Sequence, residues 1–410
     1  MKRCLFVFGL SLVTSVICST TATLADDASD AQPAIVGPVR DGKDYAPPPL
    51  VDLGKRHKIK VVYLIPSDRE PAANFQPKIE VLLAFVRDVY RRDLVAKGYE
   101  STGPDFEFAD GRLKVHLLKT DKPASHYNFE PNYSNQPKVF DRIMPEVEAA
   151  HGPLSDNFYF VLAETYALGP SPYEWPGNFA LGGYRSATGG AGTFSSWILR
   201  DELCATTIEE QLKLFADATP IEGRTAHGHG RPNSPRFEFI EDGFGAVCHE
   251  LGHAFGCPHD TRQEPSDIMA NGFRRFRVNY LGDFSEQPAM CFSPENARLL
   301  AASRFLCDDV DAADNQPPTA SISAPNKIAK DATRIPIKIK ATDDKRLAAL
   351  VFYTSQGDTV RGGKELSGTE QELEYEVVVA NLQPGELRLV THLVDGGGNL
   401  VSAVNKITVE

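Results

Sequence analysis

Three histidines and a glutamate lie close together in the segment HELGHAFGCPH, residues 249–259. His249 and His253 are four residues apart, so on a helix both imidazoles point to the same side and can bind one ion. Glu250 would then reach a water molecule at that ion. Imidazole nitrogen is a common zinc ligand. The spacing therefore predicts a helix that carries two zinc ligands and a general base.

The residues after this helix offer a third ligand. Gly256 follows His253 by three residues, and glycine adopts with least strain the left-handed conformation that ends many helices. The chain can then turn back and bring His259 to the metal. Three histidines leave one position of a tetrahedral zinc ion open, as in catalytic sites. The alternative interpretation is a solvated helix with unrelated histidines.

The pattern HExxHxxGxxH, followed by the turn SDIMAN at 266–271, resembles the metzincin clan of zinc peptidases. The resemblance implies that Met269 lies beneath the three histidines as an apolar floor. The resemblance to the metzincin clan is carried by residues 237–273. The predicted order of strands and helices extends this resemblance to residues 57–308. It does not cover residues 319–410.

The residues around the motif leave the family within the clan open. Asp260, directly after the third histidine, matches adamalysin-like members, but those usually carry Cys at the position of Asp267. Astacin-like members carry a tyrosine that can join the metal where this chain has Asn271. We therefore expect no tyrosine ligand.

The resemblance implies a zinc-dependent endopeptidase in which Glu250 takes a proton from a zinc-activated water and passes it to the leaving amine. Clan members bind an extended peptide beside an edge strand, and the glycine-rich stretch 180–197 is the candidate edge here. Two other functions stay open. One is a binding or adhesion protein built on a catalytically silent metzincin scaffold, and the other is a different zinc hydrolase, such as an exopeptidase.

The elements that must position the motif alternate between strands and helices. Apolar, strand-like runs and segments of helical spacing follow one another at residues 58–66, 77–97, 112–119, 138–150 and 157–164. This alternation predicts an α/β (α+β) catalytic domain with a twisted, mostly parallel sheet and an active-site helix. We assign it residues 57–311.

Residues 312–318 form a proline-containing linker, and residues 319–410 contain short alternating strands typical of a β-sandwich. ATDD at 341–344 and VDGGGN at 394–399 resemble bacterial immunoglobulin-like modules. Such a module would be a spacer or would dock on a surface, a polysaccharide or the substrate. Its acidic residues are turn residues or, alternatively, calcium ligands: Asp343, Asp344 and Asp395.

The first 25 residues have the layout of a secretory signal peptide. Lys2 and Arg3 precede an apolar run from Cys4 to Cys18, and small residues flank the expected cleavage after Ala25. A membrane anchor or a lipid on Cys18 are the alternatives. Residues 26–56 read as a flexible leader or short propeptide. The sequence thus predicts a secreted, periplasmic or cell-envelope protein.

Removal of residues 1–25 changes the count of basic residues from 43 to 41 against 55 acidic ones, so the net charge becomes −14. This charge opposes binding to nucleic acid or anionic lipid. His227 and His229 could hold a second metal, although a solvated loop without nearby carboxylates is the simpler interpretation.

Five cysteines remain after the signal peptide. In an exported protein they predict up to two disulfides around the motif, with the pairing left open. Since three histidines suffice for zinc, we do not expect thiolate ligands. The five are Cys204, Cys248, Cys257, Cys291 and Cys307.

Overall fold

The computed structural model describes most of the chain, namely residues 41–127, 136–166, 180–222, 233–263, 265–311 and 313–410. The predicted signal peptide, the first part of the predicted leader, and His227 and His229 lie outside these residues. None of the described helices is both long and apolar enough to cross a membrane.

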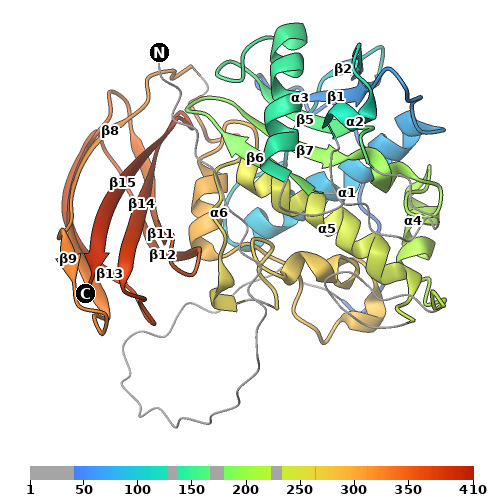
Figure 1. Cartoon of the computed structure of the whole chain (residues 1–410). Coiled ribbons are helices and arrows are strands. Elements are labelled where there is room, and N and C mark those ends of the chain that lie inside the picture. Colours follow the sequence, from blue (N-terminus) through green and yellow to red (C-terminus); the bar gives the residue numbers. More distant parts are fainter. Residues whose placement is uncertain (1–40, 128–135, 167–179, 223–232, 264, 312) are drawn as a thin grey trace.

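A five-stranded, mostly parallel sheet forms the centre of the larger unit, as the sequence predicts (Figure 1). Its strands, in spatial order, are β4 Val115–Lys119, β1 Lys60–Ile65, β5 Phe158–Ala163, β7 Gly190–Ser195 and β6 Ala180–Arg185. The first four run parallel, and β6 is antiparallel to β7. β1 and β5 are apolar on both faces because both faces are covered. A small hairpin pairs β2 Phe108–Ala109 with β3 Arg112–Leu113.

Helices cover both faces of this sheet. The longer ones are α1 Phe75–Ala96, α3 Gln136–His151 and α5 Arg236–Ala254, and the shorter ones are α2 Ala124–Tyr127, α4 Ile208–Phe215 and α6 Pro294–Ala301. The 3₁₀ segments within the described residues are η2 Ser196–Leu199, η3 Thr261–Gln263, η4 Gly272–Asn279 and η5 Gly282–Phe284. Successive residues of β1 point to opposite faces of the sheet, and each face has its own apolar core. Val61 and Tyr63 belong to the core that contains α1 and α5. Val62 and Leu64 belong to the core that contains α3.

Residues 319–410 form two facing antiparallel sheets. One contains β13 Glu370–Val378, β10 Arg334–Thr342 and β8 Thr319–Ser323. The other contains β12 Thr359–Glu365, β11 Leu347–Thr354, β14 Gly385–Asp395, β15 Leu400–Val409 and, parallel to β15, β9 Lys327–Ile328. β10 alternates between exposed and buried residues, and its buried side chains join those of the facing sheet in one apolar core. We call this unit the sandwich.

The sandwich packs directly on the larger unit. Figure 1 shows β11 and β12 beside α6, and an apolar cluster joins Leu299 of α6 and Ala302, directly after the helix, to Val351 and Val360. The backbone N–H of Leu400 also donates to the carbonyl of Ala187 at 2.9 Å. The two units therefore share a buried contact in addition to the connecting segment.

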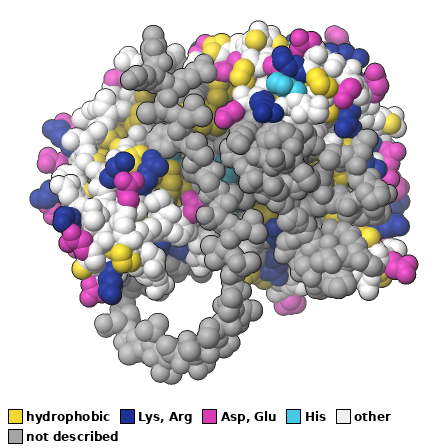
Figure 2. Space-filling model, viewed as in Figure 1, with side chains coloured by type: hydrophobic (Ala, Val, Ile, Leu, Met, Phe, Trp, Pro, Cys, Tyr) yellow, Lys and Arg dark blue, Asp and Glu magenta, His cyan; other side chains and the backbone are white. Residues whose placement is uncertain are grey.

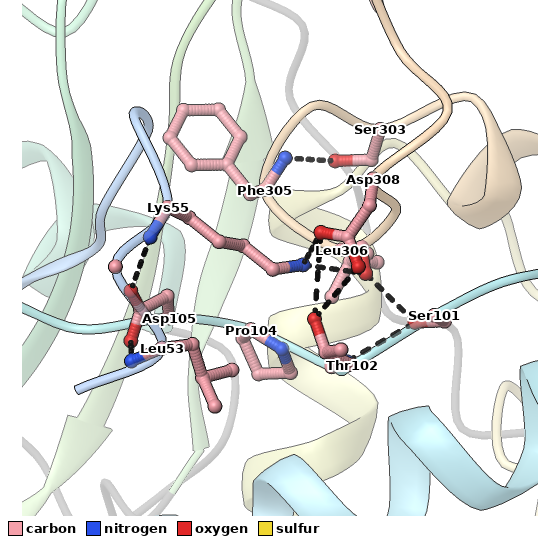
Figure 3. A network of polar contacts seen from close by, with 12 residues as sticks. Leu53, Lys55, Ser101, Thr102, Pro104, Asp105, Ser303, Phe305, Leu306 and Asp308 are labelled. Carbon is pink, nitrogen blue, oxygen red and sulfur yellow. Dashed lines mark hydrogen bonds and ion pairs between the residues drawn. The ribbon is translucent and has the colours of Figure 1, made fainter. Parts of the chain in front are cut away.

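The described part of the predicted leader, residues 41–56, also lies against the larger unit (Figure 3). The ammonium group of Lys55 donates to the carbonyl of Leu306 at 3.0 Å and pairs with Asp308 at 3.0 Å. The buried carboxylate of Asp105 accepts from the backbone N–H groups of Leu53 and Lys55 at 3.2 and 3.1 Å. Polar contacts thus hold this stretch in place.

The predicted disulfides are not formed: all five cysteines of the described residues are free and buried. Two of the thiols donate to backbone carbonyls, Cys204 to that of Lys78 at 3.5 Å and Cys257 to that of Asn296 at 3.9 Å. Burial raises the pKa of Cys204 to about 12, so its reactive thiolate is scarce. The thiols are part of the packed interior.

Charged side chains of both signs are interspersed on the face seen in Figure 2. Over the described part of this face, Lys and Arg do not gather into a continuous basic patch. This distribution fits the acidic net charge of the sequence.

Candidate metal centre

The end of helix α5 sets the direction of the metal-binding segment. The helix ends at Ala254, and Gly256 follows in the left-handed region with φ +94°. The N–H of Gly256 donates to the carbonyl of His253 at 2.9 Å, and that of Cys257 to Gly252 at 2.9 Å. These bonds satisfy the last carbonyls of the helix. The predicted helix end at this glycine is confirmed.

Strand β6 crosses directly over α5. A Cβ atom at Gly183 would lie 2.2 Å from the carbonyl oxygen of Glu250 and 2.7 Å from the backbone nitrogen of Ala254. Only glycine permits this approach without displacement of the strand or the helix. The edge strand of the sheet is therefore held beside the turn of α5 that carries Glu250.

The three predicted histidine ligands converge on one point. The Nε2 atom of His259 lies 3.3 Å from that of His249 and 3.1 Å from that of His253. A tetrahedral zinc ion with Zn–N bonds of about 2.0–2.1 Å would hold two nitrogen ligands roughly 3.3–3.4 Å apart. The observed spacing is close to that value, so the site fits zinc.

Each imidazole is oriented by its other ring nitrogen. Nδ1 of His249 donates to the carbonyl of Ile268 at 2.7 Å. Nδ1 of His253 donates to the carbonyl of Cys257 at 2.8 Å, and Nδ1 of His259 donates to the carboxylate of Asp358 at 2.5 Å. Because Nδ1 donates in each case, the three Nε2 atoms face one another with lone pairs. A cation between them removes this repulsion.

The electrostatic environment favours neutral imidazoles on α5. Burial lowers the pKa of His249 to about 3 and that of His253 well below its ordinary value. Burial acts in the same direction on His259, but the hydrogen bond and charge of Asp358 outweigh it and raise the pKa. Neutral imidazole is the form that binds metal.

Glu250 is partly exposed on α5, one residue after the first ligand. Burial raises the pKa of its carboxyl group to about 7, and the charge of His259 opposes this rise. The same coupling acts on His259, where Glu250 helps to raise the pKa. The carboxylate therefore lies within electrostatic range of the metal ligands, as a general base requires.

The turn that contains Met269 lies beneath α5. Met269 is fully buried, and a Cβ atom at Gly252 would lie 2.5 Å from its sulfur. The preceding residue, Ile268, accepts the hydrogen bond from His249. This turn thus packs against the helix between the two histidine-bearing turns and orients one of the ligands.

A buried ion pair secures the chain after the third histidine. The guanidinium of Arg262 binds both carboxylate oxygens of Asp260 at 2.9 and 2.6 Å and reaches Glu295 of α6 at 2.5 Å. The N–H of Asp260 donates to the carbonyl of Met269 at 3.2 Å. The segment that carries His259 is therefore tied both to α6 and to the turn below.

The residue that sequence reasoning misses is Asp358, which comes from the sandwich. It lies in the β11–β12 hairpin with φ +37°, and 99 residues separate it from His259. Around this contact, the N–H of Val360 donates to the carbonyl of His259 at 2.9 Å, and Thr359 accepts from the N–H of Thr261 at 2.9 Å. In the sequence, Asp358 is part of a Gly-Asp pair, which indicates only a turn.

The acidic residues of the sandwich are arranged differently from the sequence expectation. Asp343 and Asp395 lie together, but their third partner is Asp314 of the connecting segment, whereas Asp344 is exposed and outside the group. One oxygen atom from each of the three residues lies within 4.8 Å of the others.

Comparisons with known proteins agree with this geometry. The family model Metallopep, described as "Putative peptidase family", matches residues 100–343. A Schizosaccharomyces pombe protein named "Putative zinc metalloproteinase" is 27% identical over 166 residues, which are 40% of this chain and 25% of that protein. The match thus spans about a quarter of the length of this relative.

Solved structures with a similar fold include those of OgpA from Akkermansia muciniphila. The wild type has a TM-score of 0.55 at 14% identity and covers 90% of this chain and 98% of its own. A catalytically inactive form, in complex with an O-glycopeptide substrate, has a TM-score of 0.53 at 15% identity and covers 90% and 97%. At these identities the likeness concerns the fold, and it extends over both units of the chain.

Proposed function

Since this chain belongs to the Metallopep family of peptidases, we propose that it is a secreted zinc-dependent endopeptidase with His249, His253 and His259 as metal ligands. The observation that carries this proposal is the convergence of three Nε2 atoms, each on an imidazole whose Nδ1 is already engaged. When bound, zinc supplies a Lewis acid that polarises the scissile carbonyl and makes water more acidic.

Glu250 handles the proton in this mechanism. Its carboxylate accepts a proton from the attacking water and returns it to the leaving amine. Two features support this role: its position directly after the first ligand on α5 and its electrostatic coupling to His259. A carboxylate in this position has no need to bind the metal itself.

Strand β6 is the proposed docking edge for the peptide. It is an outer strand of the sheet, and within the described residues only β7 pairs with it. An extended substrate can add to such an edge through main-chain hydrogen bonds. Because β6 lies against α5 at Glu250, a peptide beside it would pass close to the metal ligands. An open edge of this kind suits cleavage within a chain rather than at its end.

Asp358 is a positioning residue in this proposal. Its carboxylate accepts the hydrogen bond from Nδ1 of His259 and so favours the ring orientation that presents Nε2 to the metal. The sandwich would then contribute to the metal centre instead of acting only as a spacer.

The test compares wild type with Glu250→Gln, using exposed Glu286→Gln as a matched control. We expect about one zinc per chain in all three proteins and a loss of casein cleavage of at least roughly 100-fold in Glu250→Gln alone. Wild-type turnover in Glu250→Gln would contradict the role of Glu250. Zinc binding without cleavage of any substrate by the wild type would favour the silent binding scaffold.

Analysis of the cleavage products distinguishes an endopeptidase from an exopeptidase. New termini inside the substrate support an endopeptidase, whereas release of single terminal residues identifies an exopeptidase. The substrates tested should include an O-glycosylated peptide, since OgpA has been solved with an O-glycopeptide substrate.

Secretion is tested by the N-terminal sequence of the protein recovered from its native cells. A start at Asp26 supports the proposal, and a start at Met1 contradicts it.

A further inference from the structure

Three carboxylates from distant parts of the chain meet at the junction of the two units. Asp314 comes from the connecting segment, Asp343 follows β10, and Asp395 ends β14. One oxygen of each lies within 4.8 Å of the others. Bringing three like charges this close is unfavourable unless a cation or protons compensate them.

The cluster contains buried oxygen atoms without protein partners. The side chain of Asp314 is only 3% exposed, and its Oδ2 atom is buried with no hydrogen-bond partner among the described residues. The Oδ2 atom of Asp343 is likewise buried and has no hydrogen-bond partner among the described residues. Asp395 is fully buried, and among the described residues its carboxylate accepts hydrogen bonds from Gly397 and Asn399 of its own loop alone. Burial without a partner is costly for an ionised oxygen.

Arg304 lies within electrostatic range of Asp314 and Asp395, and Arg185 within range of Asp395, so basic side chains offset part of this charge from a distance. Within the described residues no Lys or Arg forms an ion pair with the three carboxylates. The nearby guanidinium of Arg304 donates instead to the backbone carbonyl of Asp314 at 2.9 Å and to the amide oxygen of Asn399 at 2.5 Å. Burial raises the pKa of Asp395 to about 6, and also raises that of Asp314. These features describe a site that gains from an external cation.

We propose that Asp314, Asp343 and Asp395 bind one calcium ion. Calcium accepts oxygen ligands at about 2.3–2.6 Å, so two oxygens on opposite sides of the ion are roughly 4.6–5.2 Å apart. The three oxygens of the cluster lie within 4.8 Å of one another, so one calcium ion can reach all of them. Magnesium demands near-ideal octahedral geometry and usually keeps several waters, whereas calcium accepts the irregular set of carboxylates that these separate segments supply. Water and carbonyl oxygens would complete the calcium shell.

The ion would fasten the connecting segment to the sandwich. Asp314 lies 13 residues after the end of α6 at Ala301, and its carbonyl accepts a hydrogen bond from Arg304. The other two ligands belong to turns at one end of the sandwich. Calcium would therefore restrict the joint between the unit that carries the histidines and the unit that carries Asp358. The site is independent of the proposed peptidase chemistry.

The test titrates calcium into the full mature chain, freed of divalent ions and reloaded with one equivalent of zinc. Asp343→Asn is the test variant, because an asparagine oxygen can still accept from the N–H groups of Lys345 and Arg346, as Asp343 does now. Asp344→Asn is the matched control, with the same charge change at the adjacent exposed residue. Circular dichroism checks that both variants fold.

We expect one calcium per wild-type chain in equilibrium dialysis and a rise in Tm of several degrees at saturation. Asp343→Asn should bind at least about tenfold more weakly and lose the rise in Tm, whereas Asp344→Asn should behave like wild type. The proposal is overturned by a wild type without saturable calcium binding, by unchanged binding in Asp343→Asn, or by magnesium binding of equal affinity. None of these readouts depends on peptide cleavage.

Discussion

One of the buried acidic residues of α5, Glu241, makes the stability of the protein depend on pH. Glu241 lies about two turns before the first histidine ligand, is 5% exposed, and pairs with Arg277 at 3.5 Å. Burial raises its pKa to about 8, although Arg277 opposes the rise. The folded state therefore binds this proton more tightly than the unfolded state does. Its contribution to stability is present at low pH and is lost as the pH rises from about 4.5 towards 8.

Replacement of Glu241 by Gln should remove this dependence. Between pH 5 and 8 the free energy of unfolding of the wild type should fall by roughly 3 kcal/mol relative to that of Glu241→Gln, because one pKa unit corresponds to about 1.4 kcal/mol. Urea unfolding of both zinc-saturated proteins at pH 5, 6.5 and 8 measures the difference. A constant gap across this range would show that Glu241 is already ionised in the folded protein.

Local spacing explains which residues could be found from the sequence. His249, His253 and Gly256 are close in the chain, so helical geometry alone predicts their arrangement. Asp358 and Asp314 could not be found in this way, because their partners lie far along the chain and meet them only after the units pack. Disulfides were expected from compartment and cysteine count, but neither indicates whether two thiols are neighbours in the core.

At the level of elements, the glycine-rich stretch 180–197 divides into two strands with different roles. β6 is the outer strand, as the sequence predicts, whereas β7 pairs on both sides and is wholly buried. The prediction of one edge was therefore wrong for β7. Composition could not separate them, because glycines of both strands lie close to α5: a Cβ atom would meet the carbonyl oxygen of Glu250 at Gly183 in β6 and that of Ala254 at Gly190 in β7.

Gly183→Ala should separate β6 from α5. The added Cβ atom would overlap backbone atoms of Glu250 and Ala254, which no side-chain rotation can relieve. We expect a loss of about 1–3 kcal/mol in the free energy of unfolding, and a larger loss in kcat/KM than in zinc content. Tyr184→Ala, at a neighbouring side chain that is 43% exposed, is the control and should change stability little. Equal stability of Gly183→Ala and wild type would mean that the two elements can move apart freely.

At the level of the whole molecule, the sandwich is joined to the metal centre by several kinds of contact. Apolar side chains of α6 pack on β11 and β12, and backbone bonds join His259 to Val360 and Ala187 to Leu400. The proposed calcium site lies at the same junction, where Asp314 meets the turns of the sandwich. The sequence predicts both folds separately but not their contact, since each unit has its own core and its own pattern of strands.

The contact between Asp358 and His259 makes zinc affinity depend on the sandwich. Asp358→Asn removes the charge but keeps an oxygen that can accept from Nδ1, and asparagine tolerates the left-handed backbone at this position. We expect zinc affinity to fall by roughly 10-fold, at the lower end of the 10–100-fold range typical of partners behind a metal ligand. Competition with a chelator of known affinity measures this, and exposed Asp331→Asn in the same unit is the control. A change in Tm without a change in zinc affinity would assign Asp358 to packing alone. Weaker zinc binding at an unchanged Tm would make it part of the metal centre.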